Sequence, residues 1–113
     1  MNQNNSENLL SLVAKLVEYA PLRYTPAGIE VLTLTLSHQS KQFVAQGLAE
    51  RQVELHIKAQ LFGQLANKAQ KLVLGQTALF KGYLAPTRAG SKALWFMITS
   101  FETVDFDAST TTS

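Results

Sequence analysis

A chain of 113 residues fits one domain, and an apolar content of 46% is enough to bury a core, which excludes a disordered chain. The absence of cysteine excludes disulfides, thiolate metal sites and cysteine nucleophiles, and suits a reducing compartment. The net charge is only +2, but residues 55–101 contain six lysines and arginines and no aspartate or glutamate. Such a stretch gives part of the surface a positive field that attracts polyanions, unless it is only a solvated basic face.

Residues 1–8 are polar, and we expect them to form a disordered leader. This leader has no basic n-region, and the apolar run that follows it is broken by Lys15 and Glu18. We therefore expect neither a signal peptide nor a membrane span. These features predict a soluble protein of the cytoplasm that has no membrane partner.

Segment 9–19 has two interpretations. Its apolar residues follow a helical period, and Ser6 or Asn8 could cap a helix that begins there. This pattern favours a helix, although a buried strand would tolerate as many apolar residues.

The next three segments are simpler. In residues 29–38 three leucines alternate with threonine and serine, which predicts a half-buried strand. Residues 39–50 contain Ser, Gln, Lys and Gly and predict a loop. Residues 51–58 alternate again and predict another strand.

A short helix and a longer strand follow. Residues 60–70 have helical spacing, with Leu61, Phe62, Leu65 and Ala66 expected to point inward. Residues 72–85 predict a strand whose two glycines suit bends or bulges. One face of that strand is expected to carry Ala78, Phe80, Gly82 and Leu84, and the other Leu79, Lys81 and Tyr83.

The last part of the domain predicts a turn and a strand. Residues 86–91 contain Pro and Gly and form a turn with Arg88 near its centre. Residues 92–106 predict the last strand. We expect Leu94, Phe96 and Ile98 on one face, and Trp95, Met97, Thr99 and Phe101 on the other. Residues 107–113 are of low complexity and are expected to be a disordered tail.

This order of elements indicates an all-β protein. Five strands with a short helix between the third and the fourth match a small Greek-key barrel of the OB type, here spanning residues 9–106. Barrels of this type bind oligonucleotides or oligosaccharides, but the fold alone does not set the function.

The sequence offers little for catalysis. Neither His38 nor His56 has an acidic residue or cysteine at metal-ligand spacing. Ser37 and His38 point to opposite faces of a strand, so they do not form a catalytic dyad. We therefore expect no enzyme, no metal site and no cofactor.

Binding of single-stranded DNA is better supported by the residue types. Cations follow the phosphates of a single strand, and flat rings stack on its bases. The cations and rings best placed for this are Arg23, Tyr24, Phe43, Arg51, Lys81, Tyr83, Arg88, Lys92 and Trp95. Each has a structural alternative: Trp95 and Phe101 could cover a subunit interface, and Arg23 could only fix its own turn.

Three short motifs resemble a known family. They are Ala20-Pro21-Leu22-Arg23, Pro26-Ala27-Gly28-Ile29 and His38-Gln39-Ser40, followed later by Gly82-Tyr83-Leu84 and a basic turn. Together they are similar to the PriB family of primosomal replication proteins, which are relatives of bacterial single-stranded DNA-binding proteins. The resemblance covers roughly residues 9–106.

The resemblance implies an OB fold, with a strand rather than a helix in segment 9–19. It also implies a homodimer in the bacterial cytoplasm that binds single-stranded DNA in replication restart, with the helicase PriA and other primosome proteins. The family's aromatic residue before the basic turn falls on Tyr83, and its basic positions on Arg88 and Lys92.

The chain also departs from the family pattern. Val53 stands where the family can have a tryptophan, Arg51 is the nearest cation, and the basic turn is short. These departures predict weaker DNA binding than in the best-endowed members.

Two other functions are open from the sequence. One is a general single-stranded DNA-binding protein, although this chain ends in Ser-Thr-Thr-Thr-Ser instead of an acidic, aromatic tip. The other is an OB-fold adaptor that contacts proteins and binds little DNA.

Overall fold

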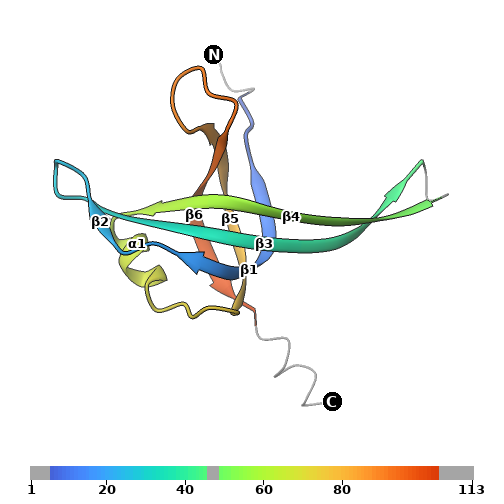
Figure 1. Ribbon diagram of the computed structural model, residues 1–113, viewed down its shortest axis with the longest axis horizontal. Coiled ribbons are helices and arrows are strands. Elements are labelled where there is room, and N and C mark those ends of the chain that lie inside the picture. The colour runs from blue at the N-terminus through green and yellow to red at the C-terminus, as the bar shows by residue number, and fades with distance from the viewer. Residues whose placement is uncertain (1–5, 46–48, 105–113) are drawn as a thin grey trace.

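The computed structural model describes residues 6–45 and 49–104. In these residues, strands form a closed barrel from which a long two-stranded arm projects (Figure 1). The strands are β1 (Leu10–Tyr19), β2 (Arg23–Tyr24), β3 (Glu30–Val44), β4 (Ala49–Phe62), β5 (Thr77–Pro86) and β6 (Leu94–Thr103). Helix α1 (Gln64–Ala69) lies between β4 and β5.

The barrel is closed by β1, which pairs with two strands. The sheet order is β1-β5-β6-β4-β3-β2, and β1 also pairs with β3. The pairings are antiparallel except for that of β4 with β6, which is parallel. Because β2 has only two residues, the barrel has five main strands with a helix between the third and the fourth. This confirms the predicted OB-type barrel.

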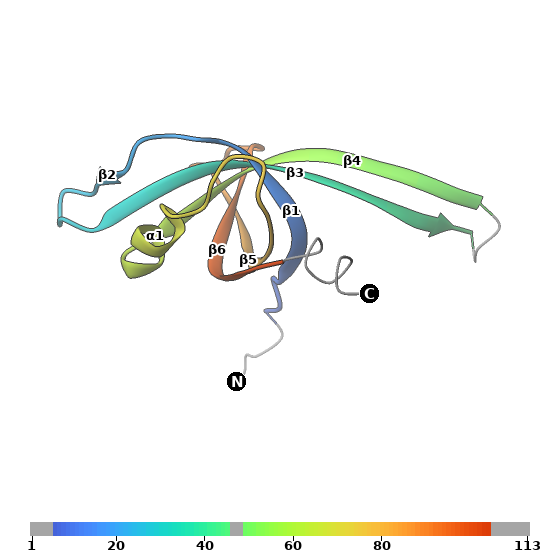
Figure 2. The same cartoon turned by 90° about the horizontal axis from the view of Figure 1, so that it is seen from below.

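The core is filled by alternate residues of the five main strands. Its largest fully buried side chains are Leu16, Leu34, Leu36, Leu61, Phe80 and Phe96. Helix α1 contributes Ala66 and Ala69 and lies against β3 and β4 (Figure 2). The alternation of leucines in segment 29–38 therefore identified the inward face of β3 correctly.

The helix favoured for segment 9–19 is wrong, and the strand implied by the family resemblance is confirmed. Along β1 burial has a period of two: Ala14 and Leu16 are buried, whereas Val13 and Val17 are 40% and 39% exposed. Pairing with β5 and β3 supplies backbone hydrogen bonds along the strand. These long-range pairings override the helical spacing of the apolar residues.

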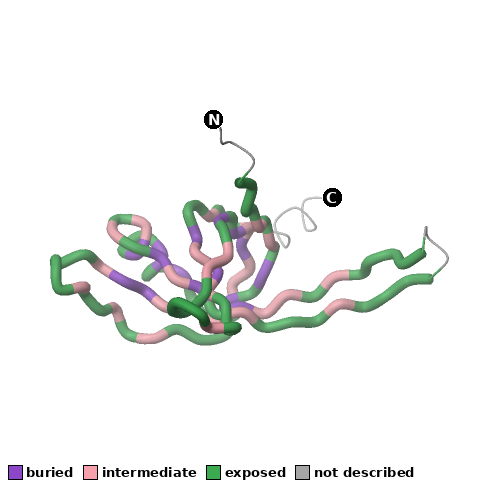
Figure 3. The backbone as a smooth tube through the Cα atoms, turned by 90° about the horizontal axis from the view of Figure 1, so that it is seen from above, coloured by how far each residue is buried: buried purple, intermediate pink, exposed green. Residues whose placement is uncertain are grey.

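The loop expected at residues 39–50 is also wrong. Strand β3 continues to Val44 and β4 begins at Ala49, and their register is unbroken from Val31↔Phe62 to Val44↔Ala49. Beyond the barrel this hairpin is an arm exposed on both faces (Figure 3). Its polar residues mark solvent exposure, while cross-strand hydrogen bonds keep the backbone extended.

The expected helix began too early. Gly63, with φ of 69°, ends β4 and precedes α1, so Leu61 and Phe62 belong to the strand. Leu61 is buried as expected, but Phe62 is 42% exposed and does not point into the core. The following strand begins only at Thr77, after a turn in which Gly75 has φ of 90°.

The last strand, β6, contains a bulge that changes which residues point inward. Lys81 pairs with Ser100 but Gly82 pairs with Ile98, so Thr99 is an extra residue. Phe101 therefore turns to the core side and packs against Phe80, with ring centroids 6.0 Å apart. The expectation that Phe101 shares a face with Trp95 is wrong, and so is the inward position of Leu94, which is 48% exposed.

Candidate nucleic-acid interface

Two aromatic rings and a lysine lie together on the outer face of β5 and β6. Lys81 and Tyr83 alternate with the buried Phe80 and Gly82, so both point outward. Across the pair, Tyr83 faces Met97 and Ala85 faces Trp95, which places Trp95 diagonally from Tyr83. Tyr83 is 41% exposed and Trp95 is half-buried, so each ring presents part of its surface to solvent.

The loop between β5 and β6 holds two more cations beside these rings. Its shape is fixed by hydrogen bonds: the Thr87 amide donates to the Ala93 carbonyl at 2.9 Å, and the Ala93 amide donates to the Ser91 hydroxyl at 3.0 Å. Arg88 and Lys92 are exposed in this loop. The loop is thus an ordered rim that carries two positive charges next to Trp95.

Lys58 is a further candidate residue that the sequence analysis missed. In the parallel pairing Ala59 lies opposite Phe96. Lys58 and Trp95 each precede one of these residues, so the two side chains lie next to each other on neighbouring strands. Lys58 is exposed. Because Lys58 precedes the apolar Ala59 on a strand, the sequence indicates that its side chain points outward. No feature of the sequence shows that β4 lies beside β6.

We call these six residues the β5–β6 face. They are Lys58, Lys81, Tyr83, Arg88, Lys92 and Trp95. Two features of the sequence located most of the face: the spacing of Lys81 and Tyr83, and the basic turn that follows. The parallel neighbour β4 completes it on one side.

Arg23 and Tyr24 lie elsewhere. They form β2, which pairs with the start of β3 through Arg23↔Val31 and Tyr24↔Glu30, so the two side chains point to opposite faces. The turn after them is fixed by Thr25, which accepts the Gly28 amide on its carbonyl at 2.8 Å and the Ile29 amide on its hydroxyl at 3.1 Å. The turn at residues 25–29 is therefore ordered by Thr25, without a contribution from Arg23.

Phe43 and Arg51 lie on the arm, Phe43 in β3 rather than in the expected loop and Arg51 in β4 as expected, and they too point to opposite faces. Phe43 faces Glu50 across the hairpin, and Arg51 faces Gln42. Phe43 is 69% exposed, with no core beneath it. The described part of the arm carries Lys41 and Arg51 but also Glu50 and Glu54, so its charges balance.

The nine residues expected from the sequence thus fall into three places. Five belong to the β5–β6 face, two to β2 and two to the arm. Figure 1 shows β2 and the arm at opposite ends of the long axis, with the β5–β6 loop projecting between them. That axis measures 50 Å. The structure therefore brings together one compact set and leaves two distant pairs.

The β5–β6 face carries four cations and no acidic residue of its own, which favours an anionic ligand, although Glu18 lines a hollow together with Lys58 and Glu102 lines one together with Lys81. The nearest acidic residue on β6 is Glu102, which faces Leu79 beyond Lys81. Lys68 of α1 lies over the Phe101 ring at 5.5 Å from its centroid and belongs to a different surface. Glu30, whose pKa is lowered by its own backbone N–H and by the Asn67 amide, lies at the start of β3.

The described residues hold no group of three or more His, Asp or Glu side chains that could bind a metal ion. Across the same residues, no helix has the length and apolar character needed to cross a membrane.

Comparison with known proteins identifies the family. A model described as "Another single-strand binding protein family" matches residues 8–100. Replication restart protein PriB of Bordetella pertussis is 39% identical over 84 residues, which cover 74% of this chain and 77% of that relative. The chain belongs to the PriB family.

Solved structures agree with this membership. PriB from Ralstonia solanacearum is 36% identical, with a TM-score of 0.79, and the match covers 88% of this chain and all of that one. The single-stranded DNA-binding protein from Thermus aquaticus is 22% identical, with a TM-score of 0.71 over 90% of this chain and 52% of that one. At this identity, the second match shows only that the two chains share a fold.

Proposed function

We propose that this protein binds single-stranded DNA on the β5–β6 face and acts as an accessory protein of the primosome in replication restart. The observation that carries the proposal is the grouping of Tyr83 and Trp95 with four exposed cations on one side of an OB barrel. Membership of the PriB family supports the replication role.

The chemistry of the β5–β6 face suits a single strand better than a duplex. Unpaired bases stack on the exposed parts of Tyr83 and Trp95, each stack contributing roughly 1–3 kcal/mol. Lys58, Lys81 and the loop cations lie around the rings, where they can follow the phosphates. A duplex keeps its bases stacked inside and offers the rings nothing to bind.

The arm and β2 extend the path of the bound strand. Phe43 offers an exposed ring at one end of the molecule, and Arg23 a cation at the other. Because the arm's charges balance, we assign it a stacking role and only a small share of the phosphate contacts. A single-stranded DNA that contacts β2, the β5–β6 face and the arm together must span much of the long axis of the molecule.

We also propose contacts with other primosome proteins, the helicase PriA among them, as the family resemblance implies; relatives named replication restart proteins support the restart role. We propose that such partners recognise this protein together with its DNA. The alternative function is an adaptor that contacts proteins and does not bind DNA. The experiment below distinguishes it from the proposed function.

The free side of β1 supports a homodimer. β1–β3 pairing begins at Lys15, whereas β1–β5 pairing covers Leu10 to Lys15. The backbone groups of successive strand residues point to alternate sides, so Ser11 directs both of its groups, and Val13 its N–H, away from β5. The Val13 carbonyl on the same side already accepts from His38. Of the described residues, none forms a strand beside this edge, and Leu9 and Val13 next to it are 82% and 40% exposed. We propose that β1 of a second copy pairs there.

The experiment uses the intrinsic fluorescence of Trp95, the only tryptophan in the sequence, together with the anisotropy of labelled oligo-dT and of a matching duplex. We expect oligo-dT to quench Trp95 and to bind more tightly than the duplex. Affinity should fall with salt on a logarithmic slope of about −0.7 for each phosphate contact.

Two substitutions test the face itself. Tyr83→Ala should weaken oligo-dT binding by about five- to one-hundred-fold, the value of one lost stack. Lys81→Ala should weaken it and reduce the salt slope, whereas Lys71→Ala, which removes an exposed lysine from the loop after α1, should change neither. If micromolar protein binds neither oligonucleotide at low salt, DNA binding is not the main function and the adaptor replaces it.

A further inference from the structure

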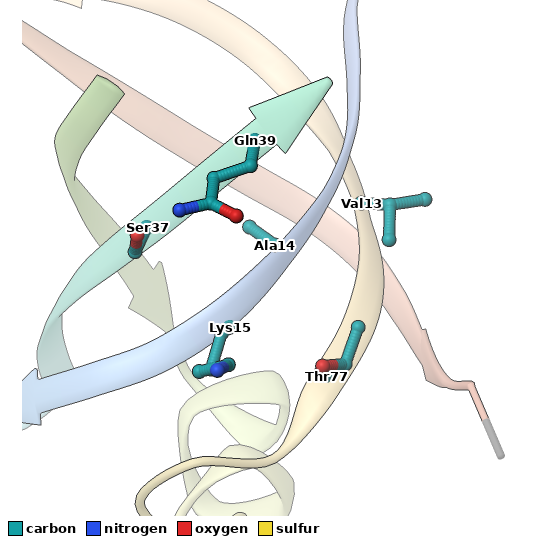
Figure 4. A pocket seen from close by; sticks show the side chains of 6 residues that line it. All are labelled: Val13, Ala14, Lys15, Ser37, Gln39 and Thr77. Atoms are coloured by element: carbon teal, nitrogen blue, oxygen red, sulfur yellow. The ribbon is translucent and has the colours of Figure 1, made fainter. Parts of the chain in front are cut away.

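The base of the arm lies at a fork between two strands. Pairing of β1 with β3 runs from Tyr19↔Leu34 to Lys15↔Ser37 and ends there. Beyond this point β1 follows β5, and β3 follows β4 into the arm. The outer side of the fork is a hollow of about 240 Å³, lined by Val13, Ala14, Lys15, Ser37, Gln39 and Thr77 (Figure 4). Among the described residues, no backbone pairing of β1 with β3 extends past this fork into the arm.

A histidine side chain spans the fork instead. The Nδ1 atom of His38 lies 2.7 Å from the Val13 carbonyl oxygen on β1, and its Nε2 atom lies 2.8 Å from the Ser40 hydroxyl. A carbonyl oxygen can only accept, so Nδ1 donates, and in the neutral ring Nε2 accepts the proton of Ser40. The amide of Gln42 then donates to the Ser40 oxygen at 3.0 Å.

These contacts form one chain of hydrogen bonds from the barrel into the arm. Residues 38, 40 and 42 are alternate positions of β3, so their side chains share one face of the strand. The chain begins on β1 and ends at Gln42, one residue before Phe43. An isolated two-stranded ribbon is marginally stable in water, so the direction of the arm depends on how its base is held.

We propose that His38 is a positioning residue that fixes the arm on the barrel and thereby sets how well the arm contacts single-stranded DNA. It acts through the Val13 carbonyl and through Ser40, without touching the DNA. The claim that the arm contacts DNA rests on the proposed function. The claim that His38 fixes the arm on the barrel concerns the protein alone.

Three substitutions separate the two hydrogen bonds. His38→Phe keeps a ring but removes both nitrogens. His38→Asn keeps a nitrogen donor attached to Cγ, as in the histidine, and should still reach the Val13 carbonyl. Ser40→Ala cuts the chain on the arm side only and serves as a second variant if His38→Phe does not fold.

The first measurement is amide hydrogen exchange of the unliganded protein. We expect His38→Phe and Ser40→Ala to speed exchange at the arm amides, residues 40–44 and 49–53, and to leave β5 and β6 unchanged. His38→Asn keeps the bond to Val13 but, like Ser40→Ala, loses the bond to Ser40, so its arm should exchange as in Ser40→Ala and more slowly than in His38→Phe. Unchanged exchange in the arm, or faster exchange throughout the barrel, would overturn the inference by showing no role or a general structural one.

The second measurement is a double-mutant cycle with Phe43→Ala on a long oligo-dT. His38→Phe should weaken binding about fivefold in the native background and have no effect when Phe43 is already Ala. Equal effects in both backgrounds would overturn the role through the arm. If the native protein binds no oligo-dT, the proposed function fails, and the exchange result still decides whether His38 holds the arm.

Discussion

Gly82 lies where two strands approach too closely for any other residue. A Cβ atom at this position would collide with the carbonyl oxygen of Met97 on the paired strand β6. The bulge at Thr99 begins beside it, and the bulge turns Phe101 into the core. One glycine therefore permits the register shift that separates the outward Trp95 from the inward Phe101.

We expect Gly82→Ala to destabilise the protein by on the order of 3 kcal/mol, since the colliding atom is backbone and cannot rotate away. Denaturant unfolding measures this loss. Gly28→Ala is the matched control, because Gly28 has φ of 86° but open space around it, and it should cost only about 1–2 kcal/mol. Equal costs at the two positions would show that the β5–β6 contact relaxes and that the collision does not matter.

At the scale of elements, α1 is tied to the start of β3 by a side-chain contact, besides the backbone hydrogen bond from its N-cap Gly63 to Glu30. The Asn67 amide donates to the Glu30 carboxylate at 2.8 Å. The backbone N–H of Glu30 and this amide hold the pKa of Glu30 below its ordinary value of 4.5. A carboxyl group whose pKa is lowered in the folded protein stabilises that state above its unfolded pKa, and the stabilisation is lost as the pH falls through the folded value.

Glu30→Gln should therefore lower stability most above about pH 4.5, and the difference from the native protein should shrink as the pH falls below that value. Thermal unfolding of both proteins between pH 3 and pH 7 measures the difference. Asn67→Ala should reproduce part of the same pH dependence, since it removes the donor. A difference that does not vary with pH would mean that the contact does not form in solution.

The strands that the sequence predicted well share a simple pattern. In β3 and β5, apolar and polar residues alternate because one face meets the core and the other meets solvent. Burial confirms the assignment of faces in Leu34, Leu36, Ala78 and Phe80. A sequence period reports one-sided burial, so strands of this kind were identified without knowledge of their partners.

The failures have equally physical reasons. Strand β1 pairs with β5 along its first half and with β3 along its second half, so its fold depends on these partners rather than on its own spacing. The arm has solvent on both faces, so it lacks the apolar alternation that marks a strand. Lys58 joined the β5–β6 face through the parallel pairing of β4 with β6, and no local pattern reports contact between segments 37 residues apart.

For the whole molecule, the free edge of β1 gives a prediction about assembly. Ser11→Pro removes an N–H group that points away from β5, so the β1–β5 ladder keeps its hydrogen bonds while an incoming strand loses a donor. We expect sedimentation to show a dimer for the native protein and a monomer for Ser11→Pro. Ser11→Ala keeps the N–H group and should remain dimeric. A dimeric Ser11→Pro with native stability would place the interface elsewhere.

The narrow parallel contact between β4 and β6 has a consequence for how the chain reaches its fold. Only the pairs Ala59↔Phe96 and Gln60↔Met97 join these strands, whereas β3 and β4 pair along fourteen positions as sequence neighbours. Local pairing forms early, because it closes a short loop, and distant pairing forms late. We expect the β3–β4 hairpin to form first. During synthesis its apolar face, with Leu34, Leu36 and Leu61, then stays uncovered until the ribosome has released Phe96, which makes this interval the time when the nascent chain is most prone to aggregate.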